Sequence, residues 1–322
     1  MRRALSLLLL MMTVAATLPA QNLKLEKTLP FSDETAIRFT AISPKGNFLA
    51  TASKDARVRL WTYPALELRK TFDLTDERIA GVWFSHDGAF LIAGGSRGKI
   101  RIWSLPSGAQ KMEFSAGDDI NALAISYDLS MMAVAAGDKP AQLWDLRLGR
   151  RVGELPTKFS GSKALCFSPD GKWLASADAD TGVRFYEGET GAPRATNDDL
   201  LLESFGAAFS SDGKYLYVGG ADKTITAIDP ATGKIVDKFP KQDYVVGILD
   251  PSPDGKTLAA GYFDEKGFDN PAPIILWDLA SKKPRTTIMQ QDFHPNGGGF
   301  LPDGRLLITS SEKGKLQVWV VM

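Results

Sequence analysis

Cysteine, histidine and an excess of either charge are all lacking in this chain. Its 322 residues include one cysteine and two histidines, and 38 basic side chains are matched by 38 acidic ones. One cysteine excludes an internal disulfide framework, and the balanced charge argues against a nucleic-acid partner, which needs a basic surface. Two histidines supply little for metal or proton-transfer chemistry. We predict no nucleic-acid binding, no cofactor, no metal and no catalytic residues.

Hydrophobic residues and turn-forming residues are both plentiful. Hydrophobic side chains make up 44% of the chain, which excludes a disordered protein. The 30 glycines and 18 prolines are spread along the chain instead of gathering in one linker. That spread is typical of a domain with many short turns.

The first twenty residues differ from the rest. Arg2 and Arg3 precede an apolar run over residues 4–16, and small residues follow. This layout predicts a secretory signal peptide over residues 1–20, cleaved after Ala20. The run is shorter than the roughly 20 residues that span a bilayer, so we expect no membrane span after its removal. Without an Asn-x-Ser/Thr site or an internal disulfide, the exported protein is expected in a bacterial periplasm or secreted.

A short turn of the Ser-Pro-Asp-Gly type recurs along the whole mature chain. Its last positions are spaced 42, 41, 42, 42, 42 and 49 residues apart. Apolar runs of strand length lie on both sides of each turn, and two further strand-like runs follow, so one unit supplies four strands. The seven copies span residues 43–46, 85–88, 126–129, 168–171, 210–213, 252–255 and 301–304.

An aromatic or apolar residue ends the third strand of every unit. These residues are Trp61, Trp103, Trp144, Tyr186, Ile228, Trp277 and Trp319. Four strands in about 42 residues with a closing tryptophan resemble the repeats of the WD-repeat β-propeller family. The resemblance implies an all-β, seven-bladed β-propeller of four-stranded blades, which forms a single domain over residues 21–322.

The two ends of the chain complement each other. Only three residues follow Trp319, so the seventh unit lacks a fourth strand. Residues 25–29 parallel residues 68–72, which form the fourth strand of the first unit. We therefore predict that the N-terminal strand closes the last blade, because this pairing removes an open sheet edge.

The units depart from the family pattern before the inner strand. Family members often carry a Gly-His pair there, and no histidine stands at the seven equivalent positions of this chain. An aspartate in the turn before the third strand is retained in four units, and we interpret it as a capping group of that turn. The four are Asp55, Asp138, Asp180 and Asp222.

Two scarce residues fit structural roles. Cys166 stands between Leu165 and Phe167 in an inner strand, and we interpret it as a small buried hydrophobic residue. His86 replaces the proline of a turn, so we expect it to be exposed.

The sixth unit carries seven extra residues between its second and third strands. In propellers that this chain resembles, this connection lies on the face used for partners, and loops often carry function. Aromatic side chains there suit a protein contact, and polar ones could offer oxygen atoms to calcium; a solvated insertion is the alternative. The residues concerned are Phe263, Asp264, Glu265, Phe268, Asp269 and Asn270.

Residues just before the inner strands should surround the same face. The charged or titratable ones are Arg78, Asp119, Glu203 and His294, which lack the convergent carboxylates or histidines of a hydrolytic site. Our first hypothesis is an exported, non-catalytic, monomeric scaffold that binds a protein or peptide through this face. The alternatives are a propeller enzyme of the lactonase or hydrolase kind, a calcium-dependent ligand binder that uses the axial channel, or a component of an envelope assembly.

Overall fold

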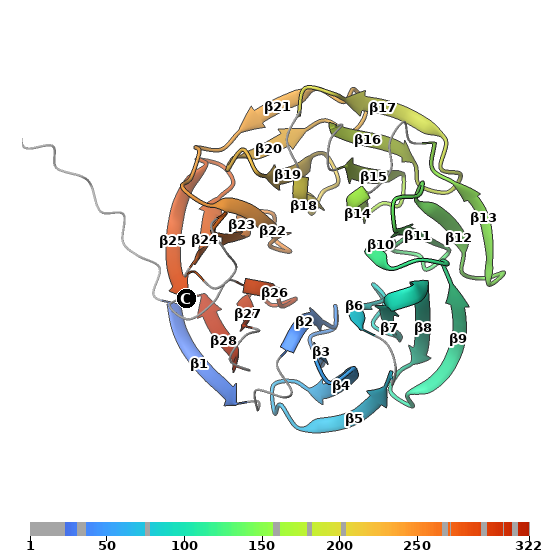
Figure 1. Cartoon of the computed structure of the whole chain (residues 1–322). Helices are drawn as coiled ribbons and strands as arrows, with labels where there is room; N and C mark the ends of the chain where they lie inside the picture. The colour runs from blue at the N-terminus through green and yellow to red at the C-terminus, as the bar shows by residue number, and fades with distance from the viewer. Residues whose placement is uncertain are drawn as a thin grey trace, which may run out of the picture.

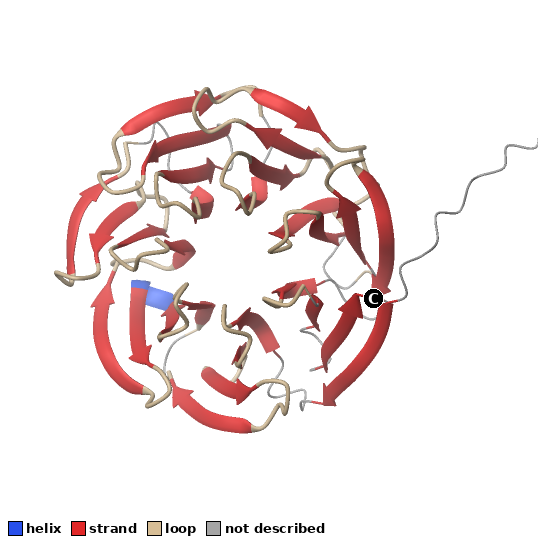
Figure 2. Ribbon diagram, turned by 180° about the vertical axis from the view of Figure 1, so that it is seen from behind, coloured by secondary structure: helices blue, strands red, loops and turns tan. Residues whose placement is uncertain are grey.

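The structure is a ring of four-stranded antiparallel sheets, seen from one side in Figure 1 and from behind in Figure 2. This computed structural model describes residues 23–30, 37–74, 78–156, 162–178, 182–200, 204–265, 270, 272–290, 295–304, 306–310 and 315–321. Within these residues the only helix is η2 (Ser96–Gly98), and no helix is long and apolar enough to cross a membrane.

Six sheets are each formed by four strands that follow one another in the chain. The first two contain β2 (Ile37–Ile42), β3 (Phe48–Ser53), β4 (Arg57–Thr62) and β5 (Leu68–Asp73), then β6 (Ile79–Phe84), β7 (Phe90–Gly95), β8 (Lys99–Ser104) and β9 (Ala109–Ser115). The next two contain β10 (Ile120–Ile125), β11 (Met131–Ala136), β12 (Gln142–Asp145) and β13 (Arg150–Glu154), then β14 (Ser162–Phe167), β15 (Trp173–Asp178), β16 (Gly182–Glu187) and β17 (Pro193–Asn197). The last two contain β18 (Ser204–Phe209), β19 (Leu216–Gly220), β20 (Ile225–Ile228) and β21 (Ile235–Lys238), then β22 (Val245–Pro251), β23 (Thr257–Phe263), β24 (Ala272–Asp278) and β25 (Lys283–Gln290).

The remaining sheet is joined from both ends of the chain. Its order is β1-β28-β27-β26, with β1 (Leu23–Pro30), β26 (Pro295–Phe300), β27 (Leu306–Ser310) and β28 (Lys315–Val321). β1 runs antiparallel to β28, with Leu23 opposite Val321 and Pro30 opposite Lys315. The expectation of seven blades is therefore corrected. Six blades are formed by continuous stretches of the chain, and the other four-stranded sheet forms only because the two ends of the chain pair. The pairing gives β28 a hydrogen-bonded neighbour on each side.

In the six continuous blades the first strand lies nearest the axis and the fourth lies at the rim, and in the joined sheet β26 is innermost and β1 lies at the rim (Figure 1). We call the face that carries the connections from the innermost to the second strands the turn face. The other side, where the chain enters each innermost strand, is called the opposite face. The unit-six insertion joins β23 to β24 and therefore belongs to the opposite face.

The recurring turn is held by its serine and aspartate. In the fourth sequence unit, the Ser168 hydroxyl donates to Asp170 Oδ1 at 2.7 Å and accepts the Trp173 amide N–H at 2.9 Å. Gly171 has a φ of 72°, a conformation that strains any other residue. The same serine–aspartate bond forms in four other units, between Ser85 and Asp87, Ser126 and Asp128, Ser210 and Asp212, and Ser252 and Asp254.

The core lies between neighbouring blades, because each sheet buries both of its surfaces. Phe72 of β5 packs against Trp103 of β8 with ring centroids 4.6 Å apart. Phe239, which follows β21, meets the Trp277 ring edge-on at 5.5 Å. Contacts of this kind bind each blade to the next, so the ring is stabilised by burial and not by the sheets alone.

The residues that end the third strands each follow a β-bulge in the six continuous blades. Trp103, Trp144, Tyr186 and Trp277 are buried, whereas Trp61 is partly exposed. The indole N–H of Trp144 donates to Gln142 Oε1 at 3.1 Å, and that of Trp277 donates to the Tyr262 hydroxyl at 3.1 Å. Polar groups of the same blade therefore satisfy these indoles without a histidine. The side chain of Trp319 lies outside those described.

The turn aspartates have different surroundings. Asp55 and Asp222 each accept the backbone N–H two residues further on, at 3.2 and 3.1 Å. Asp138 is exposed and accepts no hydrogen bond within the described part of the chain. Asp180 lies outside the described residues.

A buried ion pair in the fourth blade went unnoticed in the sequence. Asp178 and Arg184 pair in the core, and Asp178 Oδ1 also accepts the hydroxyls of Ser162 at 2.9 Å and Ser176 at 2.6 Å. Arginine stands two residues before the closing aromatic residue in the first, second and fourth units, which is a signal that aligned units could have revealed. The two hydroxyls help to compensate the burial of the carboxylate.

Candidate functional site

Two hollows lie on the turn face, and Tyr127 and Pro169 line both of them. One is a groove of about 790 Å³ between turns of the third, fourth and fifth blades. The other is an axial cavity of about 660 Å³ with residues from every sheet in its wall. A hollow beside Asp222 on the opposite face has a volume of about 140 Å³. The larger hollows are therefore on the face that the sequence-based hypothesis did not choose.

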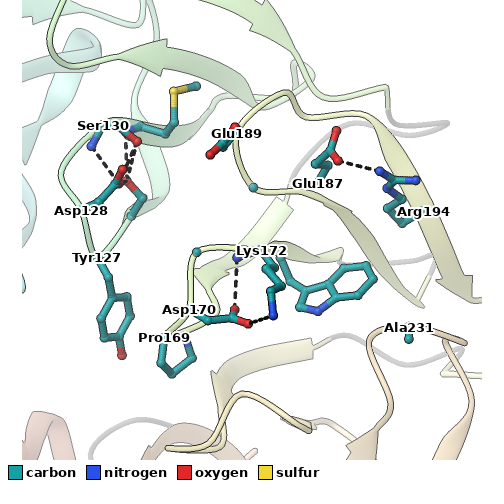
Figure 3. Close-up of a pocket in the computed structure, with 15 residues that line it drawn as sticks. Tyr127, Asp128, Ser130, Pro169, Asp170, Lys172, Glu187, Glu189, Arg194 and Ala231 are labelled. Atoms are coloured by element: carbon teal, nitrogen blue, oxygen red, sulfur yellow. Dashed lines mark hydrogen bonds and ion pairs between the residues drawn. The ribbon is translucent and has the colours of Figure 1, made fainter.

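The groove combines a carboxylate-rich rim with apolar side chains (Figure 3). Trp173, the first residue of β15, is partly exposed and supplies the apolar part, with the buried Met131 of β11 at its base. Four acidic and two basic side chains also line the groove, so its charge is net negative. They are Asp128, Asp170, Glu187, Glu189, Lys172 and Arg194.

Ion pairs within the groove involve two of its four carboxylates; of the other two, Asp128 accepts the hydroxyls of Ser126 and Ser130, and Glu189 is exposed. Lys172 Nζ lies 3.0 Å from Asp170 Oδ2, and Arg194 Nη2 lies 2.6 Å from Glu187 Oε1. Glu189 is exposed on the turn after β16 and forms no ion pair with the described residues. Figure 3 shows it across the groove from Lys172. A positive group on a ligand could therefore form an ion pair with Glu189 without breaking an existing ion pair.

The rim of the axial cavity is formed by the second residue of each recurring turn. Four prolines stiffen this rim, because the proline ring fixes its backbone φ angle. His86 is exposed, and its ring stacks on Tyr127 with centroids 3.9 Å apart. The seven rim residues are Pro44, His86, Tyr127, Pro169, Ser211, Pro253 and Pro302.

Asp250, near the end of β22, is the acidic residue in the wall of this cavity. Its Oδ2 accepts the Phe300 amide N–H at 2.6 Å. Within the described residues this is the one hydrogen bond that the Asp250 side chain forms. Gly299 lies so close that an added Cβ would be 2.9 Å from the same oxygen. Loss of solvation raises the pKa of Asp250 to about 7, while the Phe300 N–H acts in the other direction.

The pKa values of the other titratable groups in the cavity are shifted toward their neutral forms. Desolvation raises the pKa of the Cys166 thiol to about 12, so this residue is not a reactive thiolate. Desolvation also raises the pKa of Tyr127, and the negative charges of Asp250 and Cys166 raise it further. Burial lowers the pKa of His86, against the effect of Asp87. Cys166 is partly exposed and lines the cavity, so it is less buried than the sequence-based interpretation expected.

The residues predicted in the unit-six insertion contact the fifth blade. Phe263 meets the Phe205 ring edge-on with centroids 5.2 Å apart, and Glu265 Oε2 lies 3.1 Å from Lys223 Nζ. Asp264 Oδ2 accepts the Asn270 side-chain N–H at 3.0 Å, so the amide presents nitrogen and not oxygen to this carboxylate. Phe268 and Asp269 lie outside the described residues.

Two predicted residues around the opposite face form a pair between the second and third blades. Arg78 Nη2 lies 3.4 Å from Asp119 Oδ2, and both side chains are exposed. Asp119 Oδ1 also accepts the Arg97 amide N–H at 2.8 Å. Glu203 and His294 lie outside the described residues, so the structure does not test the set that the enzyme hypothesis needs. Among the described residues, no three His, Cys, Asp or Glu side chains converge on a metal position.

Four-stranded blades around an axis, with the first and last strands paired, define a β-propeller. The family described as WD domain, G-beta repeat matches residues 24–62, 67–104, 151–187 and 205–229, which lie in the same repeated units. The chain therefore belongs to the WD-repeat β-propeller proteins.

Several curated proteins resemble most of the chain at low identity. A WD repeat-containing protein WDS homolog of Arabidopsis thaliana is 22% identical over 294 residues, which cover 87% of this chain and 54% of that protein. Protein tipD of Dictyostelium discoideum is 23% identical over 292 residues, covering 87% and 46%. Nuclear distribution protein PAC1 of Coccidioides posadasii is 29% identical over 198 residues, covering 52% and 42%. The chain thus spans about half the length of these relatives.

Proposed function

We propose that this chain is an exported, non-catalytic scaffold that binds a basic segment of a partner protein in the groove on its turn face. Membership of the WD-repeat proteins supports a role in protein interaction. The observation that carries the choice of surface is the groove itself, with the partly exposed Trp173 as an apolar surface and Glu189 as an available carboxylate. A segment with a lysine or arginine next to an apolar residue would complement both features.

Charge reversal on the two faces tests the choice of surface. Peptides of twelve random residues are selected on the folded protein, and the affinities of the enriched sequences are measured by fluorescence anisotropy. We expect basic residues in these peptides and a loss of affinity of about fivefold or more in Glu189→Lys, which corresponds to roughly 1 kcal/mol. The comparison variant Glu265→Lys reverses an exposed carboxylate on the opposite face, where it also removes the pair with Lys223, and it should leave the affinity unchanged.

Two results would contradict the proposed surface. If only Glu265→Lys weakens binding, the partner occupies the opposite face beside the unit-six insertion. If no peptide is enriched by a protein with a normal cooperative unfolding transition, the groove is not a peptide site.

The export part of the proposal rests on residues 1–20, with two arginines before a short apolar run. N-terminal sequencing of the protein from the cell envelope should begin at Gln21. An intact N-terminus in protein from the cytoplasmic fraction would contradict export.

A further inference from the structure

The axial cavity has one carboxylate, that of Asp250, in a wall whose described residues include no other acidic side chain and no lysine or arginine. Prolines form much of its rim, and Phe167, Phe209 and Phe300 contribute to the wall. An occupant that satisfies this site must bring a positive charge and apolar surface together.

The hydrogen bond that Asp250 already forms indicates which kind of cation its carboxylate can bind. Because Oδ2 already accepts the Phe300 N–H, Oδ1 is the oxygen left for a ligand. A guanidinium pairs best with both carboxylate oxygens, whereas an ammonium group is a compact charge that one oxygen can serve. A bare metal ion needs several oxygen ligands, and the described residues form no cluster of acidic or metal-binding side chains here.

We propose that the axial cavity binds an alkylammonium group, with its charge against Asp250 Oδ1 and its carbon chain against the prolines and phenylalanines of the wall. This site differs from the groove, since it needs neither Glu189 nor a bound partner segment. The ammonium group belongs either to a free small amine or to a lysine side chain that enters from the turn face.

Binding should strengthen as Asp250 loses its proton. With a pKa of about 7, this carboxyl is roughly one-tenth ionised at pH 6 and nine-tenths ionised at pH 8. The other titratable groups facing the cavity are His86, Tyr127 and Cys166; burial lowers the pKa of His86 and raises the pKa values of Tyr127 and Cys166, so each shift favours the neutral form. We therefore expect affinity for an ammonium ion to rise about tenfold over this interval.

Calorimetric titration with benzylammonium chloride tests the site directly. The wild-type protein should bind it about tenfold more tightly at pH 8 than at pH 6, and the neutral isostere benzyl alcohol should bind at least tenfold more weakly at pH 8. Asp250→Asn should lose at least tenfold in affinity for benzylammonium. Asp198→Asn is the matched control, because it removes an exposed carboxylate outside the cavity and should bind normally.

A second titration identifies the source of the amine. Tighter binding of a capped Gly-Lys-Gly peptide than of benzylammonium assigns the site to a lysine side chain, and the reverse order assigns it to a small amine. Equal binding of benzylammonium and benzyl alcohol, or no binding of benzylammonium to folded wild-type protein at pH 8, would overturn the proposal. The comparison of these two ligands needs no variant, so it decides the matter even if Asp250→Asn fails to fold. Peptide binding in the groove is measured separately and can fail or succeed independently.

Discussion

Replacing Asp250 with asparagine should make the stability of the protein less dependent on pH. Asparagine keeps an oxygen that can accept the Phe300 N–H, but it carries no charge at any pH. In the wild-type protein the pKa of Asp250 rises from 3.8 to about 7 on folding because partial burial removes much of the solvent around the carboxylate. The folded state therefore binds this proton more tightly than the unfolded state. The resulting stabilisation is complete below about pH 3.8 and is lost as the pH rises through 7.

The size of the effect follows from the shift. A rise from 3.8 to about 7 corresponds to about 4 kcal/mol, a large part of a typical unfolding free energy of roughly 5–15 kcal/mol. Between pH 4 and pH 8, the variant should gain about this amount of stability relative to wild type. Other titrating groups are common to both proteins, so they largely cancel in the difference.

Urea unfolding at pH 4, 6 and 8, followed by tryptophan fluorescence, measures this difference. Asp198→Asn serves as a control for the removal of one negative charge from the exposed surface. A difference between Asp250→Asn and wild type that stays constant from pH 4 to pH 8 would show that the carboxylate is well solvated. That result would refute the assignment of Asp250 as a desolvated carboxylate in the axial cavity.

Three further predictions concern other parts of the ring. Asp278 has a pKa of about 2, lowered by the N–H and hydroxyl of Ser281 and by Arg285, so Asp278→Asn should cost about 2 kcal/mol at pH 7 in urea unfolding. Because the folded pKa lies below 3.8, this cost should disappear as the pH falls toward 2; a cost independent of pH would contradict the assignment. Arg184→Ala leaves Asp178 buried without its cation and should cost about 3–5 kcal/mol, and an unchanged urea midpoint would show that the pair is not needed. Deleting residues 21–30 removes β1 and should sharply lower the melting temperature measured by circular dichroism; an unchanged unfolding curve would refute closure by this strand.

Much of the architecture could be read from the chain because its signals are local. The serine, aspartate and glycine of each recurring turn interact within five residues of one another, as Ser168, Asp170 and Trp173 show. The strands between the turns follow from apolar runs of the right length. The parallel between residues 25–29 and 68–72 likewise indicated which strand would pair with β28. The units use different acceptors for the indole N–H of the closing tryptophan. The sequence did not predict these acceptors, because they depend on which side chains the β-bulges bring together.

The sites were harder to predict, because they are formed by residues from separate parts of the chain. The unit-six insertion was conspicuous in the sequence, but length alone does not show where a surface is hollow. Glu189 becomes notable only because the neighbouring Glu187 pairs with Arg194, whereas Glu189 is exposed and forms no ion pair with the described residues. Asp178 is identified as a core residue only through its contacts with Ser162 and Arg184.

The sequence by itself determined the repeated four-stranded unit, the chemistry of its turn and the strand that joins the chain ends, because hydrogen bonds over a few residues and alternating apolar patterns encode them. Only the tertiary structure decided that Asp250 faces the same cavity as Tyr127 and accepts an N–H from Phe300, fifty residues further on. Desolvation and electrostatic potential at a point depend on all the surrounding atoms, and the ring gathers those atoms from every blade.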